Sequence, residues 1–190
     1  MSEGPAAVLT IRALRAVGVE VPMTFALGTS RATIARAPLL LIDLDTEEGI
    51  TGRAYLFCYL PAAAPAVARM LDEVLRVTKG ERVAPVELWA ALSKRFALIG
   101  VQGIVRMAMA GFDVACWDAL AQAAGLPLAR MLGGETARIP AVCALPDVRE
   151  GRNWEIPNVV LGDSLISDVD RAVLAVHRQL GRQYHLPMDE

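Results

Sequence analysis

Carboxylates are the residues of this sequence whose type and spacing could support general acid–base chemistry or bind a metal ion. Asp113 and Asp118 lie in a stretch with helical spacing, and five positions place them about 140° apart around the axis. They therefore cannot share a ligand, and we expect buried salt bridges or inter-domain contacts from each. An acidic turn is normally solvated, and we expect this of the acids around a predicted hairpin: Asp43, Asp45, Glu47 and Glu48.

Other catalytic patterns are absent from the sequence. His177 and His185 have no cysteine or carboxylate at metal-ligand spacing beside them. The sequence contains no Gly-rich phosphate loop, GxSxG elbow or HExxH motif. The three cysteines are odd in number, form no CxxC pair and lie among apolar residues, which is typical of small hydrophobes in a reducing, cytoplasmic compartment. Motifs alone thus predict a domain without a self-contained active site.

Composition excludes several classes of partner. The 190 residues are 54% apolar, which is enough for a globular core. Nineteen basic and 21 acidic residues give a net charge of −2, with no basic run, so nucleic acid is not an expected partner. Neither a signal peptide nor a transmembrane helix is predicted, because apolar runs are short and interrupted. We expect a soluble protein.

The N-terminal third has the pattern of a small sheet. Residues 8–21 are rich in β-branched and aliphatic side chains and predict a strand. Residues 24–37 mix polar and apolar types without a clear period and predict a loop. Two apolar runs, 38–44 and 50–59, flank "DTEEG" and predict a hairpin in which Gly49 takes a positive φ. Together these predict a three-stranded antiparallel meander.

The middle of the chain has helical periodicity. A helix is predicted over 62–78, a second from Pro85 to Gly100, and a third closed by Gly125. A sheet followed by a helical bundle predicts an α+β fold with the helices on one face. After Gly134, short strands alternate with one amphipathic helix, which indicates the beginning of a parallel α/β unit.

Two long motifs resemble a known family. "APLLLIDLDTEEGITGRAYLF" and "RMAMAGFDVACWDAL" are similar to the N-terminal capping domain of the mandelate racemase type of the enolase superfamily, and the likeness covers about residues 8–134. The resemblance implies an α+β cap over 1–134 and, over 135–190, the incomplete start of a TIM-barrel domain. In that family the cap closes the mouth of the barrel and shapes substrate specificity.

The resemblance also implies a lid over the hydrophobic end of a substrate. Its expected residues are Leu27, Thr29, Ser30 and Ile34, joined by Phe57, Tyr59 and Leu98. Such a lining excludes water and strengthens charge interactions in the site beneath. A mandelate-like aryl 2-hydroxy acid suits it, although Gly28 replaces a polar lid residue of the closest pattern.

The family's chemistry is proton abstraction next to a carboxylate, with Mg²⁺ held by three barrel carboxylates and bases on both faces of the substrate. The two lysines of its KxK strand fall on Asn158 and Val160, and neither side chain can act as a base. Asp189 matches the first Mg²⁺ ligand, one residue before the last residue of this sequence. We therefore expect no catalytic residue in these 190 residues, no Mg²⁺ bound by them alone, and no racemase activity from them.

Two alternatives stay open. The cap could be a non-catalytic binding or homo-oligomerisation module, because its barrel-facing side would expose apolar surface. The chain could also be the N-terminal part of a longer racemase or sugar-acid dehydratase, which differ in their barrel bases. In either enzyme the partner is a small-molecule acid.

Overall fold

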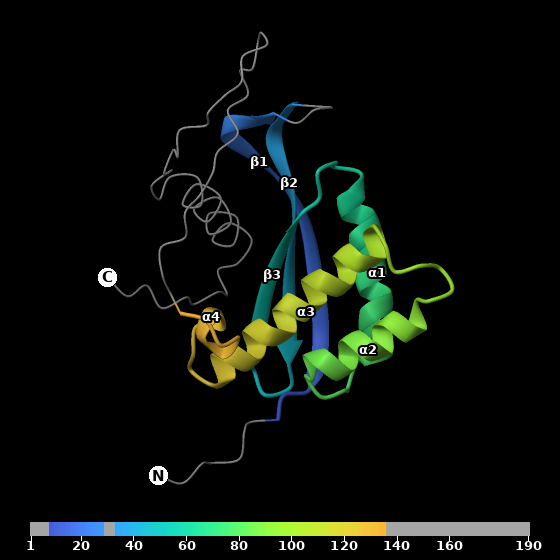
Figure 1. Ribbon diagram of the computed structural model, residues 1–190, viewed down its shortest axis with the longest axis vertical. Helices are drawn as coiled ribbons and strands as arrows, with labels where there is room; N and C mark the ends of the chain where they lie inside the picture. Colours follow the sequence, from blue (N-terminus) through green and yellow to red (C-terminus); the bar gives the residue numbers. More distant parts are fainter. Residues whose placement is uncertain (1–7, 29–32, 136–190) are drawn as a thin grey trace. The chain divides into compact units, whose positions relative to one another are not determined.

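The computed structural model describes residues 8–28 and 33–135 (Figure 1). Three strands precede four helices in this part of the chain, and the fold is α+β as predicted. The elements are β1 (Ile11–Gly28), β2 (Thr33–Thr46), β3 (Thr51–Phe57), α1 (Ala63–Thr78), α2 (Pro85–Arg95), α3 (Ile104–Ala123) and α4 (Leu128–Met131). None of the described helices is both long and apolar enough to cross a membrane.

The chain forms two compact units. The described parts of the first are 8–20 and 38–135, and those of the second are 21–28 and 33–37. The strands and helix predicted beyond the boundary near residue 134 lie almost entirely among residues 136–190, which are outside the described part. The domain division therefore stays a prediction.

The sheet has the strand order β1-β2-β3, as expected for a meander. β2 and β3 pair antiparallel, in a register that runs from Leu39 opposite Phe57 to Asp45 opposite Thr51. The turn between them contains Gly49 at φ 84°, which confirms the predicted positive φ. The start of β1 is held on both sides by backbone hydrogen bonds.

One of these bonds comes from the β2–β3 turn, where the Glu47 N–H donates to the Thr10 carbonyl at 2.9 Å. The Thr10 N–H in turn donates to the Glu48 carboxylate at 2.8 Å, which lowers the pKa of Glu48. On the other side, the Ile11 N–H donates to the Glu81 carbonyl at 2.9 Å and the Val83 N–H donates to the Leu9 carbonyl at 2.7 Å. The turn at 46–49 and the segment 80–83 thus clasp the first residues of β1.

The predicted loop over 24–37 is wrong for most of its length. β1 continues to Gly28 and β2 begins at Thr33, so only 29–32 separate the strands, and these four lie outside the described residues. Mixed composition hid the strands, because strand formation depends on pairing with a neighbouring strand more than on local propensity. Leu27 and Ile34 are consequently strand residues.

The helices α1, α2 and α3 cover one face of the part of the sheet in the first unit (Figure 1). The core between them is mostly aliphatic, with Phe96 and Phe112 as its buried aromatic residues. Its fully buried members include Leu40, Ile42 and Leu44 of β2, Val67, Leu71 and Val74 of α1, and Met109 and Phe112 of α3. Cys58 and Cys116 are buried within the same core, as predicted for small hydrophobes, whereas Cys143 lies outside the described residues.

β3 and α3 approach closely through two glycines. A Cβ atom at Gly52 would overlap the carbonyl oxygen of Ala115 and lie 2.9 Å from the Cβ of Ala119. A Cβ atom at Gly111 would lie 3.0 Å from Cδ1 of Leu56. The strand and the helix are therefore in contact at backbone distance, which only glycine permits at Gly52.

Two helix boundaries depart from expectation. α2 ends at Arg95 and not at Gly100, because Phe96 turns into the core as the C-cap, with its N–H donating to the Leu92 carbonyl at 2.9 Å. The short helix α4 was not predicted. α1 and α3 match their predicted spans closely, and Gly125 follows α3 at φ 64°.

Candidate functional site

The structure describes five of the seven residues expected over a substrate. Leu27 and Ile34 are half-buried strand residues of the second unit, and Phe57, Tyr59 and Leu98 belong to the first. Leu98 lies on the turn after α2 with its side chain fully exposed. Thr29, Ser30 and the predicted metal ligand Asp189 lie outside the described residues. The structure brings Phe57 and Tyr59 together.

The rings of Phe57 and Tyr59 form an edge-to-face pair, with centroids 4.9 Å apart and an interplanar angle of 67°. The predicted strand run over 50–59 is too long, because β3 ends at Phe57 and Tyr59 lies beyond it. Tyr59 lies in the following turn at φ 60°. The Leu60 N–H donates to the Cys58 carbonyl at 2.6 Å, so residues 58–60 form a three-residue γ-turn centred on Tyr59.

Cys58 anchors this turn. Its N–H donates to the Pro38 carbonyl at 2.8 Å, and its side chain is 3% exposed within the core. Burial raises the pKa of the Cys58 thiol, and burial followed by the nearby Asp113 charge raises that of Cys116. Both thiols are therefore protonated and unsuited to nucleophilic catalysis.

The acids near the hairpin are only partly solvated, which corrects the expectation for Asp43 and Asp45. Both are buried, and they lie on the face of β2 opposite the core because side chains alternate along a strand. Arg15 bridges them, with Nη2 3.4 Å from Asp43 Oδ2 and Nε 3.4 Å from Asp45 Oδ2. Arg12 and Arg53 complete the ion cluster. These carboxylates are engaged by arginine and do not resemble a catalytic base.

The two acids of α3 have different surroundings, as their angular separation predicts. Asp118 accepts hydrogen bonds from the Arg53 N–H at 2.7 Å and from Gln122 Nε2 at 2.6 Å, in place of the expected salt bridge. Asp118 therefore supplies a hydrogen-bond acceptor for the Arg53 N–H of β3. Asp113 is half-buried, and burial raises its pKa. Arg106, which lies on the same helix face, places its guanidinium 5.2 Å from the ring centroid of Trp89.

Nothing in residues 8–28 and 33–135 fits a metal ion. These residues contain no group of three or more His, Cys, Asp or Glu side chains arranged to bind one. Mg²⁺ prefers six oxygen ligands, several of them water, with carboxylates supplied by the protein. The described residues therefore do not fit Mg²⁺, and the assignment of Asp189 stays a prediction.

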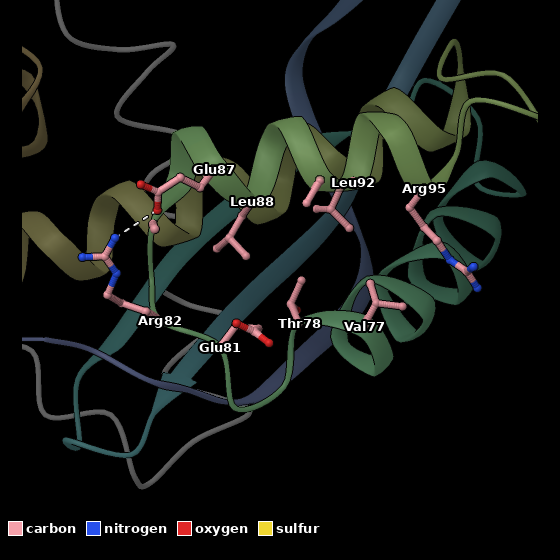
Figure 2. Close-up of a pocket in the computed structure, with 10 residues that line it drawn as sticks. Val77, Thr78, Glu81, Arg82, Glu87, Leu88, Leu92 and Arg95 are labelled. Atoms are coloured by element: carbon pink, nitrogen blue, oxygen red, sulfur yellow. Dashed lines mark hydrogen bonds and ion pairs between the residues drawn. The ribbon is translucent and has the colours of Figure 1, made fainter.

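A hollow of about 460 Å³ lies between α1 and α2, and sequence reasoning missed it (Figure 2). Leu88 and Leu92 lie along its apolar side, and at its rim Arg82 Nη2 is 3.0 Å from Glu87 Oε2. Ala84 and Ala91 also line it, and small residues on a helix that faces another helix were the signal that could have indicated it. Both arginines that line the hollow are engaged, Arg82 by Glu87 and Arg95 by Glu73 of α1, so neither is directed at a ligand.

Comparison with known proteins finds matches to the part of the chain that the structure describes. The family described as "Mandelate racemase / muconate lactonizing enzyme, N-terminal domain" matches residues 11–133. A probable glucarate dehydratase from Streptomyces coelicolor is 29% identical over 139 residues, which are 67% of this chain and 32% of that protein.

Solved structures agree. An enolase from Bradyrhizobium, complexed with magnesium and mandelic acid, is 38% identical with a TM-score of 0.67, covering 72% of this chain and 38% of that one. A mandelate racemase/muconate lactonizing enzyme from Bordetella bronchiseptica RB50 is 26% identical with a TM-score of 0.56, covering 68% of this chain and 34% of that one. The present chain spans about a third of the length of these relatives.

Proposed function

The chain belongs to the mandelate racemase / muconate lactonizing enzyme family through its N-terminal domain, and from this membership we propose that it caps the substrate of an enzyme that removes a proton next to a carboxylate. The proposed substrate is a 2-hydroxy acid with an aryl group. The proposed capping residues are Leu27, Thr29, Ser30, Ile34, Phe57, Tyr59 and Leu98.

The observation that carries this proposal is the edge-to-face pair of Phe57 and Tyr59 at the end of β3. An aromatic surface of this kind binds the apolar half of a ligand and excludes water from it. Water exclusion strengthens the charge interactions on which proton abstraction depends. The cap thereby contributes specificity and a low dielectric, while the reacting groups belong elsewhere in the enzyme.

Proton abstraction in this family uses Mg²⁺, which stabilises the charge that develops on the substrate carboxylate. The Bradyrhizobium relative binds magnesium and mandelic acid, and this supports the choice of metal and acid. Asp189 is the proposed ligand contributed by this chain. Because the described residues do not fit the metal, we assign no catalytic step to them.

A sugar-acid dehydratase is the second candidate, because the Streptomyces relative is a probable glucarate dehydratase. Glucarate carries a hydroxyl group on each carbon between its two carboxylates, and each hydroxyl buried without a partner is unfavourable. Of the seven proposed lid residues, four have no hydrogen-bonding group in their side chains, and the other three each carry one hydroxyl: Thr29, Ser30 and Tyr59. The lid chemistry of this chain therefore favours the aryl acid over the polyhydroxy acid.

A ligand titration of the chain tests the proposal. Mandelate and glucarate are added separately, and NMR follows the ring signals of Phe57 and Tyr59. We expect mandelate to shift both rings in a saturable manner and glucarate to leave them unchanged. Phe57→Leu should weaken mandelate binding at least about threefold, since it removes one aromatic contact.

Val86→Ser is the matched control, because Val86 is an equally apolar residue on α2 that is 72% exposed. This substitution should leave mandelate binding unchanged. If mandelate shifts neither ring, the proposed function is wrong. If glucarate shifts both rings at lower concentration than mandelate, the dehydratase is the better candidate.

A further inference from the structure

We propose that the outer edge of β3 at residues 55–57 pairs with the same edge of a second copy of this chain, so that two capping domains share one continuous antiparallel sheet. The interaction is β-strand addition, in which backbone groups on a sheet edge make the contact. The inference concerns the backbone of the sheet and does not depend on the proposed function. It goes beyond that function by naming a partner and the surface that binds it.

The pairing of β3 with β2 determines which backbone groups of β3 face outward. β3 is an outer strand of the described sheet and pairs antiparallel with β2. At one end of the pair the Cys58 N–H donates to the Pro38 carbonyl at 2.8 Å. At the other end the Thr46 N–H donates to the Ile50 carbonyl at 2.9 Å. Because hydrogen-bonded positions alternate along an antiparallel pair, even-numbered residues of β3 face β2, and odd-numbered residues direct their N–H and C=O groups away from it.

Side chains of α3 occupy the first half of this outer edge. The Arg53 N–H donates to Asp118 Oδ2 at 2.7 Å. The Thr51 carbonyl accepts a hydrogen bond from Gln122 Nε2 at 2.9 Å. Both bonds are made by odd-numbered residues, as the alternation requires. The start of the β3 edge is therefore closed within the chain.

The second half of the edge lacks the usual protection against strand pairing. Within residues 8–28 and 33–135, no group forms a hydrogen bond with the outward N–H and C=O groups of Tyr55 and Phe57. Natural edge strands discourage pairing with charged side chains, proline or a bulge. Residues 55–57 are Tyr-Leu-Phe, without a charge or a proline, and Tyr55 is 50% exposed. This part of β3 is thus suited to receive another strand.

A second copy fits this edge in a symmetric register. When the two strands lie antiparallel about a twofold axis at Leu56, each Tyr55 lies opposite Phe57 of the other copy. Both residues direct their backbone groups outward, so the two pairs would exchange four backbone hydrogen bonds. Every outward group at positions 55 and 57 is then satisfied by its equivalent in the other copy, as in an isologous interface.

The side chains favour the same register. Those of Tyr55 and Phe57 lie on the sheet face away from the helices, since Leu56 between them packs against the core. Each Tyr55 ring would lie across from a Phe57 ring, and aromatic cross-strand pairs are stabilising. Arg53 would lie opposite position 59 of the other copy, beyond the end of its β3 strand. The added strand therefore ends before it reaches Asp118, and no cation lies opposite another.

Sedimentation and hydrogen exchange of the whole chain test for this pair. We expect a monomer–dimer equilibrium between about 10 μM and about 1 mM, because an interface of small area binds weakly. Exchange followed by NMR should show the amides of Tyr55 and Phe57 becoming protected as the protein concentration rises. The Leu56 amide, which faces β2, should be protected at every concentration and is the internal control.

Two substitutions at one position separate the backbone from the ring. Tyr55→Pro removes the ring and the outward N–H, and an edge strand tolerates proline because that N–H makes no bond within the sheet. Tyr55→Thr removes the ring and keeps the N–H. The proline dimer would lack two hydrogen bonds that the threonine dimer retains, so its Kd should be at least about fivefold higher. Urea unfolding establishes that each variant is folded.

Three results would overturn the inference. A wild type that stays monomeric over the whole concentration range has no such pair. A dimer whose Kd is the same in the proline and threonine variants forms through another surface. Protection of the Tyr55 and Phe57 amides that does not change with concentration shows that a segment of the same chain covers the edge. If Tyr55→Pro does not fold, the exchange of the wild type decides the matter alone.

Discussion

Replacement of Gly52 by alanine should be severely destabilising, because this glycine is where β3 meets α3. The added Cβ would overlap the Ala115 carbonyl oxygen and lie 2.9 Å from both the Cβ and the N atom of Ala119, whereas ordinary contacts begin at 3.4 Å. These neighbours are helix backbone or lie directly on it, so they cannot rotate away. The helix must shift as a unit, and we expect a loss of about 3 kcal/mol or more in the free energy of unfolding, at the upper end for overpacked cores.

Two further glycine replacements serve as matched controls. In Gly111→Ala the new Cβ would lie 3.0 Å from Cδ1 of Leu56 and overlap Cδ1 of Ile42, and both are ends of flexible side chains. Better helix propensity offsets about 1 kcal/mol there, leaving a net loss of about 1 kcal/mol. In Gly18→Ala the nearest atom is the Cβ of Ala64 at 3.6 Å, so the change should be neutral or stabilising by up to about 1 kcal/mol.

Urea denaturation followed by far-UV circular dichroism measures all three variants. The midpoint should fall most for Gly52→Ala while the slope of free energy against urea stays unchanged, which identifies a loss of stability in the folded state. The reasoning is refuted if Gly52→Ala unfolds within about 1 kcal/mol of the wild type, or if Gly111→Ala is the more damaging of the two.

Three other predictions concern charged groups. Asp118→Ala should lower the free energy of unfolding by about 1–3 kcal/mol, because the partly buried Arg53 N–H loses its acceptor. Asp118→Asn, which keeps an acceptor oxygen, should lose less in the same denaturation assay. Arg15→Met, which leaves the two buried aspartates of β2 with fewer cationic partners, should cost about 1–2 kcal/mol after allowance for its half-exposed side chain, and added salt should reduce that difference. The pKa of Glu73 is lowered from 4.5 to about 2, chiefly by its hydrogen bonds from Arg76, so its stabilising effect should be complete above pH 4.5 and disappear as pH falls through about 2. An NMR titration of the Glu73 carboxyl should show that midpoint in the wild type and a higher one in Arg76→Ala.

The sequence was sufficient for features determined by local pattern. The apolar run over 38–44, the turn glycine Gly49 and the helical spacing of α1 and α3 predicted elements that the structure confirms. Each is governed by period, by residue type or by a single backbone conformation, which are properties readable within a short window. The α+β class followed from their order.

Features determined by distant partners were missed. The strand residues of 24–28 and 33–37 have no clear period of their own, and the burial of Asp43 depends on arginines from β1 and β3. At the candidate site, proximity of Phe57 and Tyr59 was predicted, but the turn that produces it was not, because tyrosine gives no signal for a positive φ. The available hint of a change in direction there was the cysteine between the two aromatic residues, since cysteine is commonly buried and Cys58 is buried in the structure.

The clasp around the first residues of β1 has a consequence for the order of assembly. The Leu9 carbonyl accepts a hydrogen bond from the Val83 N–H, and the Ile11 N–H donates one to the Glu81 carbonyl. Both partners lie far along the chain from β1. Closing so long a loop loses chain entropy before these bonds are gained, so we expect them to form after the pairing of β1 with β2, which closes only a short loop. On a ribosome, Leu9 and Ile11 can gain these bonds only after the residues through Val83 have left the exit tunnel.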